Sequence, residues 1–204
     1  MGPEILVIYK DLICFSGGGG GGSKSLETTE LVTNNQSRSH VRLPEGVSFH
    51  CLVNINTTHS LLTGGWTGWT GSRSSSSYLY SEDGGFSRIE DMKTPRYDHG
   101  CSLINDSTVI VTGGNDGGYT DTETSSEYLN LRTMTWSPGP ELPRSVSPAH
   151  MVGNILMGGR RVFKLEEEIQ AQRKQWRWIE RWEMPDTKHH ARAFLVDQDM
   201  FCKN

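Results

Sequence analysis

The stretch Val111-Thr112-Gly113-Gly114 decides the fold, because variants of it recur along the chain. Each copy has two or three apolar or small residues followed by a glycine pair, and the pairs begin at Gly17, Gly64, Gly113 and Gly158. The intervals between them are 47, 49 and 45 residues. A period of this length is typical of repeat proteins in which each repeat is one supersecondary unit. We therefore predict an array of about four similar units.

The unit around the third glycine pair shows most clearly what one repeat contains. A strand-like run ends at Ile104, and a second run, Thr108–Thr112, leads into the glycines. Two further runs follow at Ser126–Leu131 and Thr135–Ser137. Short runs rich in β-branched and aromatic residues, bounded by polar turns, predict strands. The predicted fold class is therefore all-β, with four strands in each unit.

The glycine pairs also divide the chain into units. We predict a single domain over residues 1–204, with units at about 4–46, 47–94, 95–145 and 146–186 and a partial fifth unit at 187–204. The fourth unit is irregular, because 8 residues lead from His150 to Gly158 whereas 14 lead from His99 to Gly113. It also carries a charged insertion, residues 166–174, whose composition would suit a helix and whose conformation is left open.

Six consecutive glycines, Gly17–Gly22, are followed by Ser23-Lys24-Ser25 and resemble a phosphate-binding loop. In a P-loop a glycine stands immediately before the lysine, because the backbone must approach the phosphate there. Ser23 occupies that place, and no clear helix follows. We therefore interpret Gly17 and Gly18 as the first copy of the repeat, lengthened by a glycine loop.

Composition restricts the partners and the compartment. The net charge is −4, and the absence of a basic surplus predicts no nucleic-acid partner. No apolar run approaches the ~18 residues of a transmembrane helix, and Glu4, Lys10 and Asp11 interrupt any apolar segment of a signal peptide. We predict no membrane partner and a cytoplasmic location.

The cysteines and glycosylation sequons are consistent with that compartment. The four cysteines are widely spaced in apolar runs and match no zinc pattern, so buried thiols are expected and a disulfide is the alternative. Sequons of the form Asn-X-Ser/Thr occur at Asn35, Asn56 and Asn105. This number is close to chance in a Ser- and Thr-rich chain, and it gives little support for secretion.

The units resemble the kelch repeat, and the resemblance covers nearly the whole chain. The third unit carries it best, through Pro95-Arg96, His99-Gly100, Gly113-Gly114, Glu127-Tyr128 and Trp136. The interval of 8 residues from Tyr128 to Trp136 recurs as Tyr78 to Phe86. The resemblance implies a β-propeller of four-stranded antiparallel blades.

In such a blade the glycine pair ends a strand where a side chain would crowd the turn. Tyr128 and Trp136 are expected to face each other across one hairpin and to pack between blades. Kelch propellers usually close with six blades, and four units with part of a fifth are recognisable here. Because a blade is buried by its neighbours, we expect an incomplete propeller, either a fragment of a longer protein or a truncated, non-functional copy.

The resemblance implies a non-catalytic protein-binding module, whose partner docks on the loops after the second strand and between blades. In the commonest family setting, such blades recognise the substrate of a cullin-type ubiquitin ligase adaptor; binding to actin or the cytoskeleton is the alternative. Carried over by motif position, the candidate contact residues are Trp66, Trp69, Arg96, Tyr97, Asn115, Asp116, Tyr119, Arg144, Arg160 and Arg161.

An enzymatic reading has less support. Kelch-like copper oxidases and iron-dependent specifier proteins exist, but no set of metal ligands is recognisable in this sequence. His50 and His99 hold the same repeat position, which favours a structural role. His189 and His190 are adjacent and would point to opposite sides of a strand. We predict no enzyme, no cofactor and no metal site.

Overall fold

The computed structural model describes the backbone of 4–7, 13–16, 19–20, 24–25, 29–33, 36–39, 41–67, 72–115, 123–170 and 173–183. Side chains are described within 41–67, 72–115, 123–169 and 174–183. The expected partial fifth unit and the candidates Trp69, Asp116 and Tyr119 lie outside these residues. Within them all regular structure is strand, so the predicted all-β class is confirmed.

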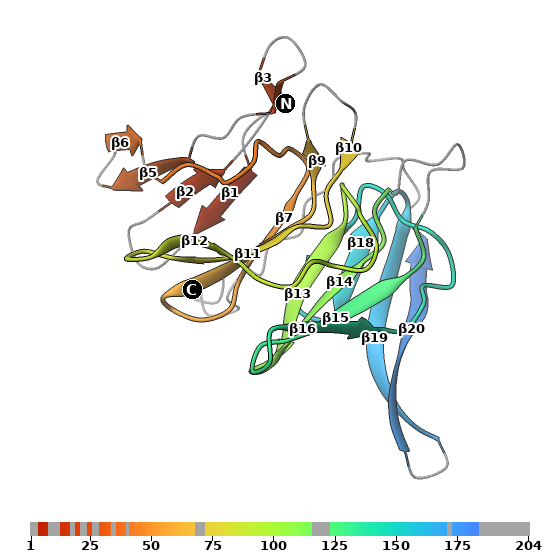
Figure 1. Cartoon of the computed structure of the whole chain (residues 1–204). Helices are drawn as coiled ribbons and strands as arrows, with labels where there is room; N and C mark the ends of the chain where they lie inside the picture. Colours follow the sequence, from red (N-terminus) through yellow and green to blue (C-terminus); the bar gives the residue numbers. More distant parts are fainter. Residues whose placement is uncertain are drawn as a thin grey trace, which may run out of the picture.

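Four four-stranded antiparallel sheets follow one another along the chain (Figure 1). Sheet 1 contains β1 (Glu4–Val7), β2 (Ile13–Ser16), β5 (Thr29–Thr33) and β6 (Gln36–Ser39). Sheet 2 contains β7 (Cys51–Asn54), β8 (His59–Thr63), β11 (Ser77–Ser81) and β12 (Gly85–Arg88). Sheet 3 contains β13 (Gly100–Asn105), β14 (Thr108–Thr112), β15 (Ser126–Asn130) and β16 (Thr135–Pro138). Sheet 4 contains β17 (His150–Val152), β18 (Ile155–Gly158), β19 (Arg161–Gln170) and β20 (Arg173–Glu183).

Two small hairpins complete the described strands. The pair β3 (Gly19–Gly20) and β4 (Lys24–Ser25) lies within the glycine-rich stretch, and β9 (Trp66–Thr67) pairs with β10 (Ser72–Arg73) after the second glycine pair. Gly20 is opposite Lys24 in an antiparallel register. This stretch therefore forms a short hairpin instead of the strand, loop and helix of a phosphate-binding loop.

Neighbouring sheets meet through their first strands: β1 contacts β7, β7 contacts β13, and β13 contacts β17. The segments that connect consecutive sheets are linker 1–2 (residues 41–50), linker 2–3 (residues 89–99) and linker 3–4 (residues 139–149). These linkers are also joined by their backbones. Asp98 N–H donates to the Phe49 carbonyl oxygen at 2.9 Å, and Ala149 N–H donates to the Asp98 carbonyl oxygen at 2.8 Å.

Apolar clusters fill the spaces between the sheets. Junction 2–3 is centred on Leu61, Val109, Val111, Leu129 and Trp136. Junction 3–4 is centred on Ile110, Leu156, Phe163, Leu165 and Trp178. Successive residues of a strand in sheet 3, such as Val109 and Ile110, thus face different neighbouring sheets, as the period of two in a strand requires.

The glycine pairs of sheets 2 and 3 each lie where two linkers approach the sheet. A Cβ atom at Gly64 would lie 2.5 Å from the Arg96 carbonyl oxygen, and one at Gly113 would lie 2.9 Å from the Val146 carbonyl oxygen. Both glycines have positive φ angles, 59° and 64°, which disfavour any residue with a Cβ. In sheets 2 and 3 the glycine pair is therefore required by the close packing of linkers against strand ends.

The aromatic pairing expected in sheet 3 was wrong. Leu129 is opposite Trp136, whereas Tyr128 is opposite Ser137. Trp136 belongs to junction 2–3, and Tyr128 packs on the other face against junction 3–4. Neighbouring residues of a strand point to opposite faces, so the interval of eight residues does not join the two rings.

The irregular fourth unit forms a long hairpin. The insertion, residues 166–174, is largely strand, because β19 and β20 pair from Arg161 and Glu183 out to Gln170 and Arg173. This hairpin extends away from the other sheets (Figure 1). Its exposed flank is lined by cross-strand ion pairs such as Lys174–Glu167 and Arg177–Glu168. Charged residues of opposite sign that face each other across the strands make this composition compatible with a β-hairpin.

Candidate functional site

In sheets 2 and 3 the residue after the glycine pair is held by the linker that precedes the sheet. Trp66 N–H donates to the Ser48 carbonyl oxygen at 2.6 Å, and Ser48 N–H donates back to the Trp66 carbonyl oxygen at 3.0 Å. Tyr97 and Asn115 form the same reciprocal pair at 2.8 and 3.1 Å. We call this end of the sheets, where Trp66 and Asn115 follow the glycine pairs, the diglycine end.

Three aromatic side chains gather at the diglycine end. The Trp66 ring lies edge-on to the Tyr97 ring, with centroids 5.0 Å apart, and the Phe49 and Tyr97 centroids are 6.2 Å apart. All three side chains are half-buried. They come from linker 1–2, β9 and linker 2–3. The structure thus brings together the candidates Trp66 and Tyr97 and adds Phe49 to them, whereas the candidate Asn115 lies beside Tyr97 with its side chain buried, unlike an exposed contact residue.

The sequence contains a weak signal for Phe49. It lies one residue before His50, as Asp98 lies one residue before His99. Both Phe49 and Asp98 have positive φ angles, 57° and 51°, which places their side chains unusually for this part of a linker. A bulky residue in this conformation was not foreseeable from the repeat pattern.

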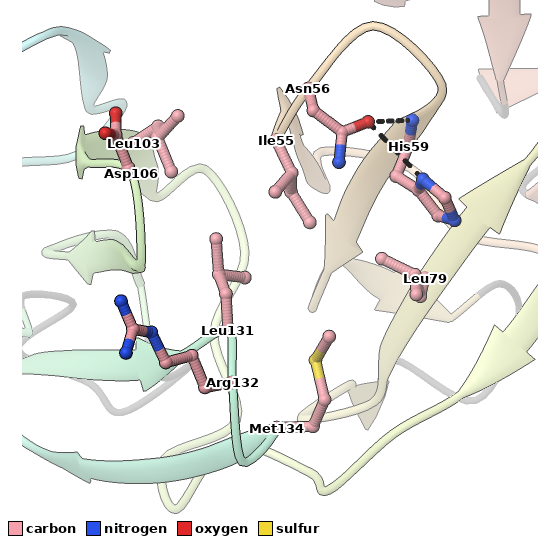
Figure 2. Close-up of a pocket in the computed structure, with 9 residues that line it drawn as sticks. All are labelled: Ile55, Asn56, His59, Leu79, Leu103, Asp106, Leu131, Arg132 and Met134. Carbon is pink, nitrogen blue, oxygen red and sulfur yellow. Dashed lines mark hydrogen bonds between the residues drawn. The ribbon is translucent and has the colours of Figure 1, made fainter.

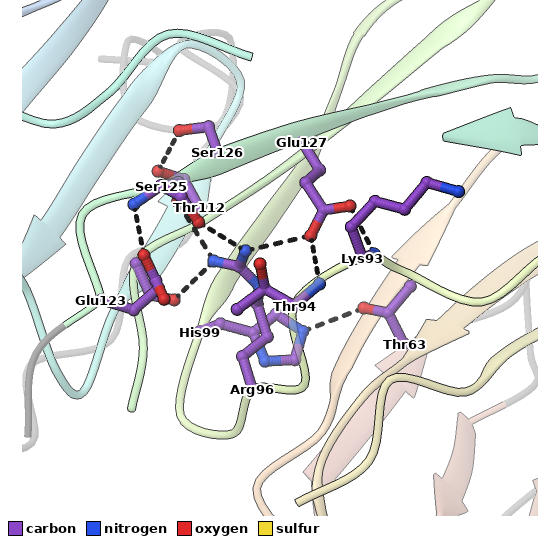
Figure 3. Close-up of polar contacts among 11 residues, drawn as sticks. Thr63, Lys93, Thr94, Arg96, His99, Thr112, Glu123, Ser125, Ser126 and Glu127 are labelled. Atoms are coloured by element: carbon purple, nitrogen blue, oxygen red, sulfur yellow. Dashed lines mark hydrogen bonds and ion pairs between the residues drawn. The ribbon is translucent and has the colours of Figure 1, made fainter. Parts of the chain in front are cut away.

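Arg96 lies inside the protein instead of at the surface expected for a contact residue. Its guanidinium is fully buried and donates to the Gly113 and Ser125 carbonyl oxygens at 3.0 and 3.1 Å. It also donates to Ser125 Oγ at 2.9 Å and pairs with the Glu127 carboxylate at 3.1 Å (Figure 3). Arg96 therefore fastens linker 2–3 to sheet 3.

Glu127 completes this buried network. Its two carboxylate oxygens accept hydrogen bonds from Lys93 N–H at 2.7 Å and Thr94 N–H at 3.0 Å. A buried carboxylate that is paired with arginine and accepts backbone hydrogen bonds is well satisfied. The network holds the backbone of linker 2–3, which carries Tyr97. This indicates that Arg96 and Glu127 position Tyr97 at the diglycine end.

His50 and His99 are buried below the diglycine end. Burial lowers the pKa of His50 to about 4. Burial, followed by the charge of Arg96 and then the nearby His50, holds the pKa of His99 well below its ordinary value. His99 Nε2 lies 3.0 Å from Thr63 Oγ1, within hydrogen-bonding distance. Both imidazoles are therefore neutral and packed.

The three remaining candidates with described side chains form a second group on sheet 4 and its linker. Arg144 and Arg161 both pair with Glu180, the former at 3.5 Å. Arg160 pairs with Glu183 at 3.8 Å. These arginines are half-exposed to exposed, and their charges are opposed by the carboxylates of β20. The candidate list therefore separates into an aromatic group at junction 2–3 and an arginine group on sheet 4.

A pocket of about 500 Å³ opens at the other end of junction 2–3. We call this end, formed by the β7–β8, β13–β14 and β15–β16 turns, the turn end. Its apolar lining includes Ile55, Leu103, Leu131 and Met134, and its polar rim includes Asn56, His59, Asp106 and Arg132 (Figure 2). The sequence pattern did not predict this pocket, although apolar residues within polar turns were a possible signal.

The described side chains contain no group of three or more His, Cys, Asp or Glu residues that could hold a metal ion. Among the same residues, no helix is long and apolar enough to cross a membrane. No protein-family model matches the chain, and no curated protein sequence matches it.

The state of Cys51 and Cys101 differs from the one expected from the sequence. These two residues form a disulfide, where buried thiols were expected. Cys51 lies in β7 and Cys101 in β13, so the bond joins the first strands of sheets 2 and 3. The two residues are 50 positions apart in sequence, and only the packing of the two sheets brings them together.

Proposed function

We propose that the four sheets are consecutive blades of a kelch-type β-propeller and that the diglycine end binds another protein. The architecture supports this reading through the period of the glycine pairs and through the contacts between first strands of successive sheets. Sheets 2, 3 and 4 bury apolar residues at the junctions between them, as blades of a propeller do.

The single observation that carries the binding proposal is the aromatic group of Phe49, Trp66 and Tyr97. Aromatic side chains that are partly exposed and rigidly held are typical anchors of protein interfaces. Here three separate segments supply them, and the pairing of Trp66 with Ser48 and of Tyr97 with Asn115 fixes their backbones. This surface is therefore pre-organised for a partner.

The proposed role is non-catalytic. Substrate recognition for a cullin-type ubiquitin ligase and binding to actin or the cytoskeleton are two forms of it, and both take place in the cytosol. A disulfide is rare in that compartment, so the bond between Cys51 and Cys101 favours a partner outside the cytosol.

The experiment compares the capture of partners, from an extract of the source cells, by three versions of this chain. They are the natural chain, the variant Trp66→Ser/Tyr97→Ser, and the matched control Arg132→Ser/Met134→Ser at the turn end. Because an interface aromatic commonly contributes more than about 1.4 kcal/mol, which is tenfold in affinity, the first variant should lose its partner at least about tenfold. The control should retain it.

Equal capture by the aromatic variant would contradict the proposal. Two defined probes distinguish the two forms of the proposed role. Purified actin filaments in a co-sedimentation assay test cytoskeletal binding, and a purified cullin in a pulldown tests the ubiquitin ligase role. Binding of either probe that is lost in the aromatic variant would place the partner in the cytosol.

A further inference from the structure

The disulfide gives independent information about where the chain matures. It joins β7 to β13, and the two strands belong to different sheets. Disulfides form and persist in oxidising compartments such as the endoplasmic reticulum and the cell exterior, and they are rare in the cytosol. The same two strands also carry two glycosylation sequons at their ends.

The sequons Asn56-Thr57-Thr58 and Asn105-Asp106-Ser107 occupy corresponding turns. The first lies in the β7–β8 turn, and the second begins at the last residue of β13 and enters the β13–β14 turn. Both asparagines are exposed. A bulky glycan attached to either would extend into solvent at the turn end without displacing a buried side chain.

At both sites the asparagine side chain makes the same two contacts with the third residue of the sequon. Asn56 Oδ1 accepts hydrogen bonds from Thr58 N–H at 2.9 Å and from the Thr58 hydroxyl at 3.0 Å. Asn105 Oδ1 accepts from Ser107 N–H at 3.0 Å and from the Ser107 hydroxyl at 3.1 Å. In each case the hydroxyl that the sequon requires contacts the side-chain carbonyl, and Nδ2 donates no hydrogen bond within the described part of the chain.

Sheet 4 provides an internal contrast. Asn154 lies in the corresponding β17–β18 turn but is followed by Ile155 and Leu156, which form no sequon. Its Nδ2 donates to the Leu165 carbonyl oxygen at 3.1 Å. The asparagine without a sequon therefore uses its amide nitrogen for structure, whereas the two sequon asparagines present theirs to solvent.

From these observations we infer that Asn56 and Asn105 are N-glycosylation sites and that the chain enters a secretory compartment. The donor is an oligosaccharide linked to a lipid diphosphate. The bond between the anomeric carbon of the first sugar and the diphosphate oxygen breaks, and a bond from that carbon to Nδ2 forms. The amide nitrogen loses one proton, and the lipid diphosphate leaves.

This inference goes beyond the proposed binding function and departs from the cytoplasmic location expected from the sequence. The two glycans would flank the pocket at the turn end, since Asn56 and Asp106 lie on its rim (Figure 2). They would leave the diglycine end, with Trp66 and Tyr97, open to a partner. Glycosylation can therefore be tested independently of binding.

The test is peptide mapping of the native protein from its source, after enzymatic removal of N-glycans in ¹⁸O-labelled water. Residues 56 and 105 should be recovered as ¹⁸O-labelled aspartate, and a peptide linking Cys51 to Cys101 should be found without reduction. An unmodified asparagine at position 56 or 105 in the native protein would overturn the assignment of that site.

Variants of the full chain, expressed in secretory cells behind a cleavable signal peptide, test whether these sites can be modified after entry. Thr58→Ala and Ser107→Ala should each abolish one glycan while keeping the asparagine. The matched variants Thr58→Ser and Ser107→Thr should keep it. A secreted natural chain that runs unchanged after glycan removal would contradict the inference, whatever its binding activity.

Discussion

The junctions on either side of sheet 3 place different chemistry at corresponding positions. In junction 2–3 the positions are filled by Arg96 and Glu127, a buried ion pair. In junction 3–4 they are filled by Val146 and Phe163, two buried apolar residues. The correspondence follows from the strand registers and from the linkers, because Gly65 N–H donates to the Arg96 carbonyl and Gly114 N–H donates to the Val146 carbonyl.

Junction 1–2 agrees with the apolar version, since Val47 and Tyr78 occupy these positions there. The same backbone arrangement therefore accommodates either an apolar pair or an ion pair at these positions. An apolar pair stabilises the fold by burying apolar surface. A buried ion pair stabilises it only if both charged residues are present, because a single buried charge has no partner. Junction 2–3 also holds the disulfide, a buried histidine at position 99 and the aromatic group. Its polar interior lies beneath the proposed binding surface.

The largest effect is expected from importing a charge into the apolar junction. Phe163→Glu places a carboxylate at a fully buried position without an arginine partner. We expect a loss of about 5 kcal/mol or more in the free energy of unfolding, because an unpaired buried charge keeps its full desolvation cost. Urea denaturation followed by circular dichroism measures it, with Phe163→Leu as the apolar control. A loss no greater than that of the control would contradict the buried position.

The second prediction removes the carboxylate from the buried ion pair of junction 2–3. Glu127→Phe leaves the Arg96 guanidinium buried without its carboxylate, and we expect a loss of about 3–5 kcal/mol. The double variant Arg96→Val/Glu127→Phe copies junction 3–4 and should be more stable than this single variant, although Lys93 N–H and Thr94 N–H lose their acceptors. A loss in the double variant equal to the sum of the losses in Glu127→Phe and Arg96→Val would show that the two residues do not interact.

Removal of the disulfide is expected to have the next largest effect. Cys51→Ser/Cys101→Ser should lower the free energy of unfolding by about 2–4 kcal/mol, because the bond restricts the unfolded chain over 50 residues. Denaturation of the natural chain with and without a reducing agent provides the same comparison. The variant itself should be insensitive to the reducing agent; a natural chain equally insensitive would mean that the bond is absent.

The buried histidines make stability depend on pH. Their pKa values are lowered in the folded state, so the unfolded chain binds more protons below pH 6.5 and stability falls as the pH falls. Each histidine should contribute a slope of about 1.4 kcal/mol per pH unit, which for His50 ends near pH 4. His99→Ala copies Ala149 of junction 3–4, and denaturation between pH 4 and 7 should show a smaller slope. An unchanged slope would contradict the burial of His99.

The sequence predicted the strands and their repetition but not their exact correspondence. Tyr78 and Tyr128 are each eight residues before an aromatic, yet the register equates Tyr78 with Glu127. The β11–β12 turn is shorter than the β15–β16 turn. An interval of eight residues therefore begins at different positions of the third strand in the two sheets. A local pattern cannot reveal such a shift, because turn length is set by backbone conformation.

In the linkers, too, residues that look equivalent in the sequence occupy different positions in the structure. Pro95-Arg96 and Pro143-Arg144 look alike in sequence, but Val146 occupies the place of Arg96. Arg96 is consequently buried, whereas the Arg144 side chain is 63% exposed. That Trp66, Tyr97 and Asn115 lie near one another could be foreseen, because their positions follow the glycine pairs; that they contact a partner stays a prediction. The disulfide depended on how two sheets pack, which the spacing of the cysteines does not specify.

The central claim, that a partner docks on the diglycine end at junction 2–3, is tested most directly by site-specific photo-crosslinking. The photoreactive residue p-benzoylphenylalanine replaces Trp66 in one protein and Arg160 in the other, since both follow the glycine pair of their sheets. We predict a crosslinked partner from position 66 and none from position 160. Crosslinking of the partner from position 160 but not from position 66 would contradict the account.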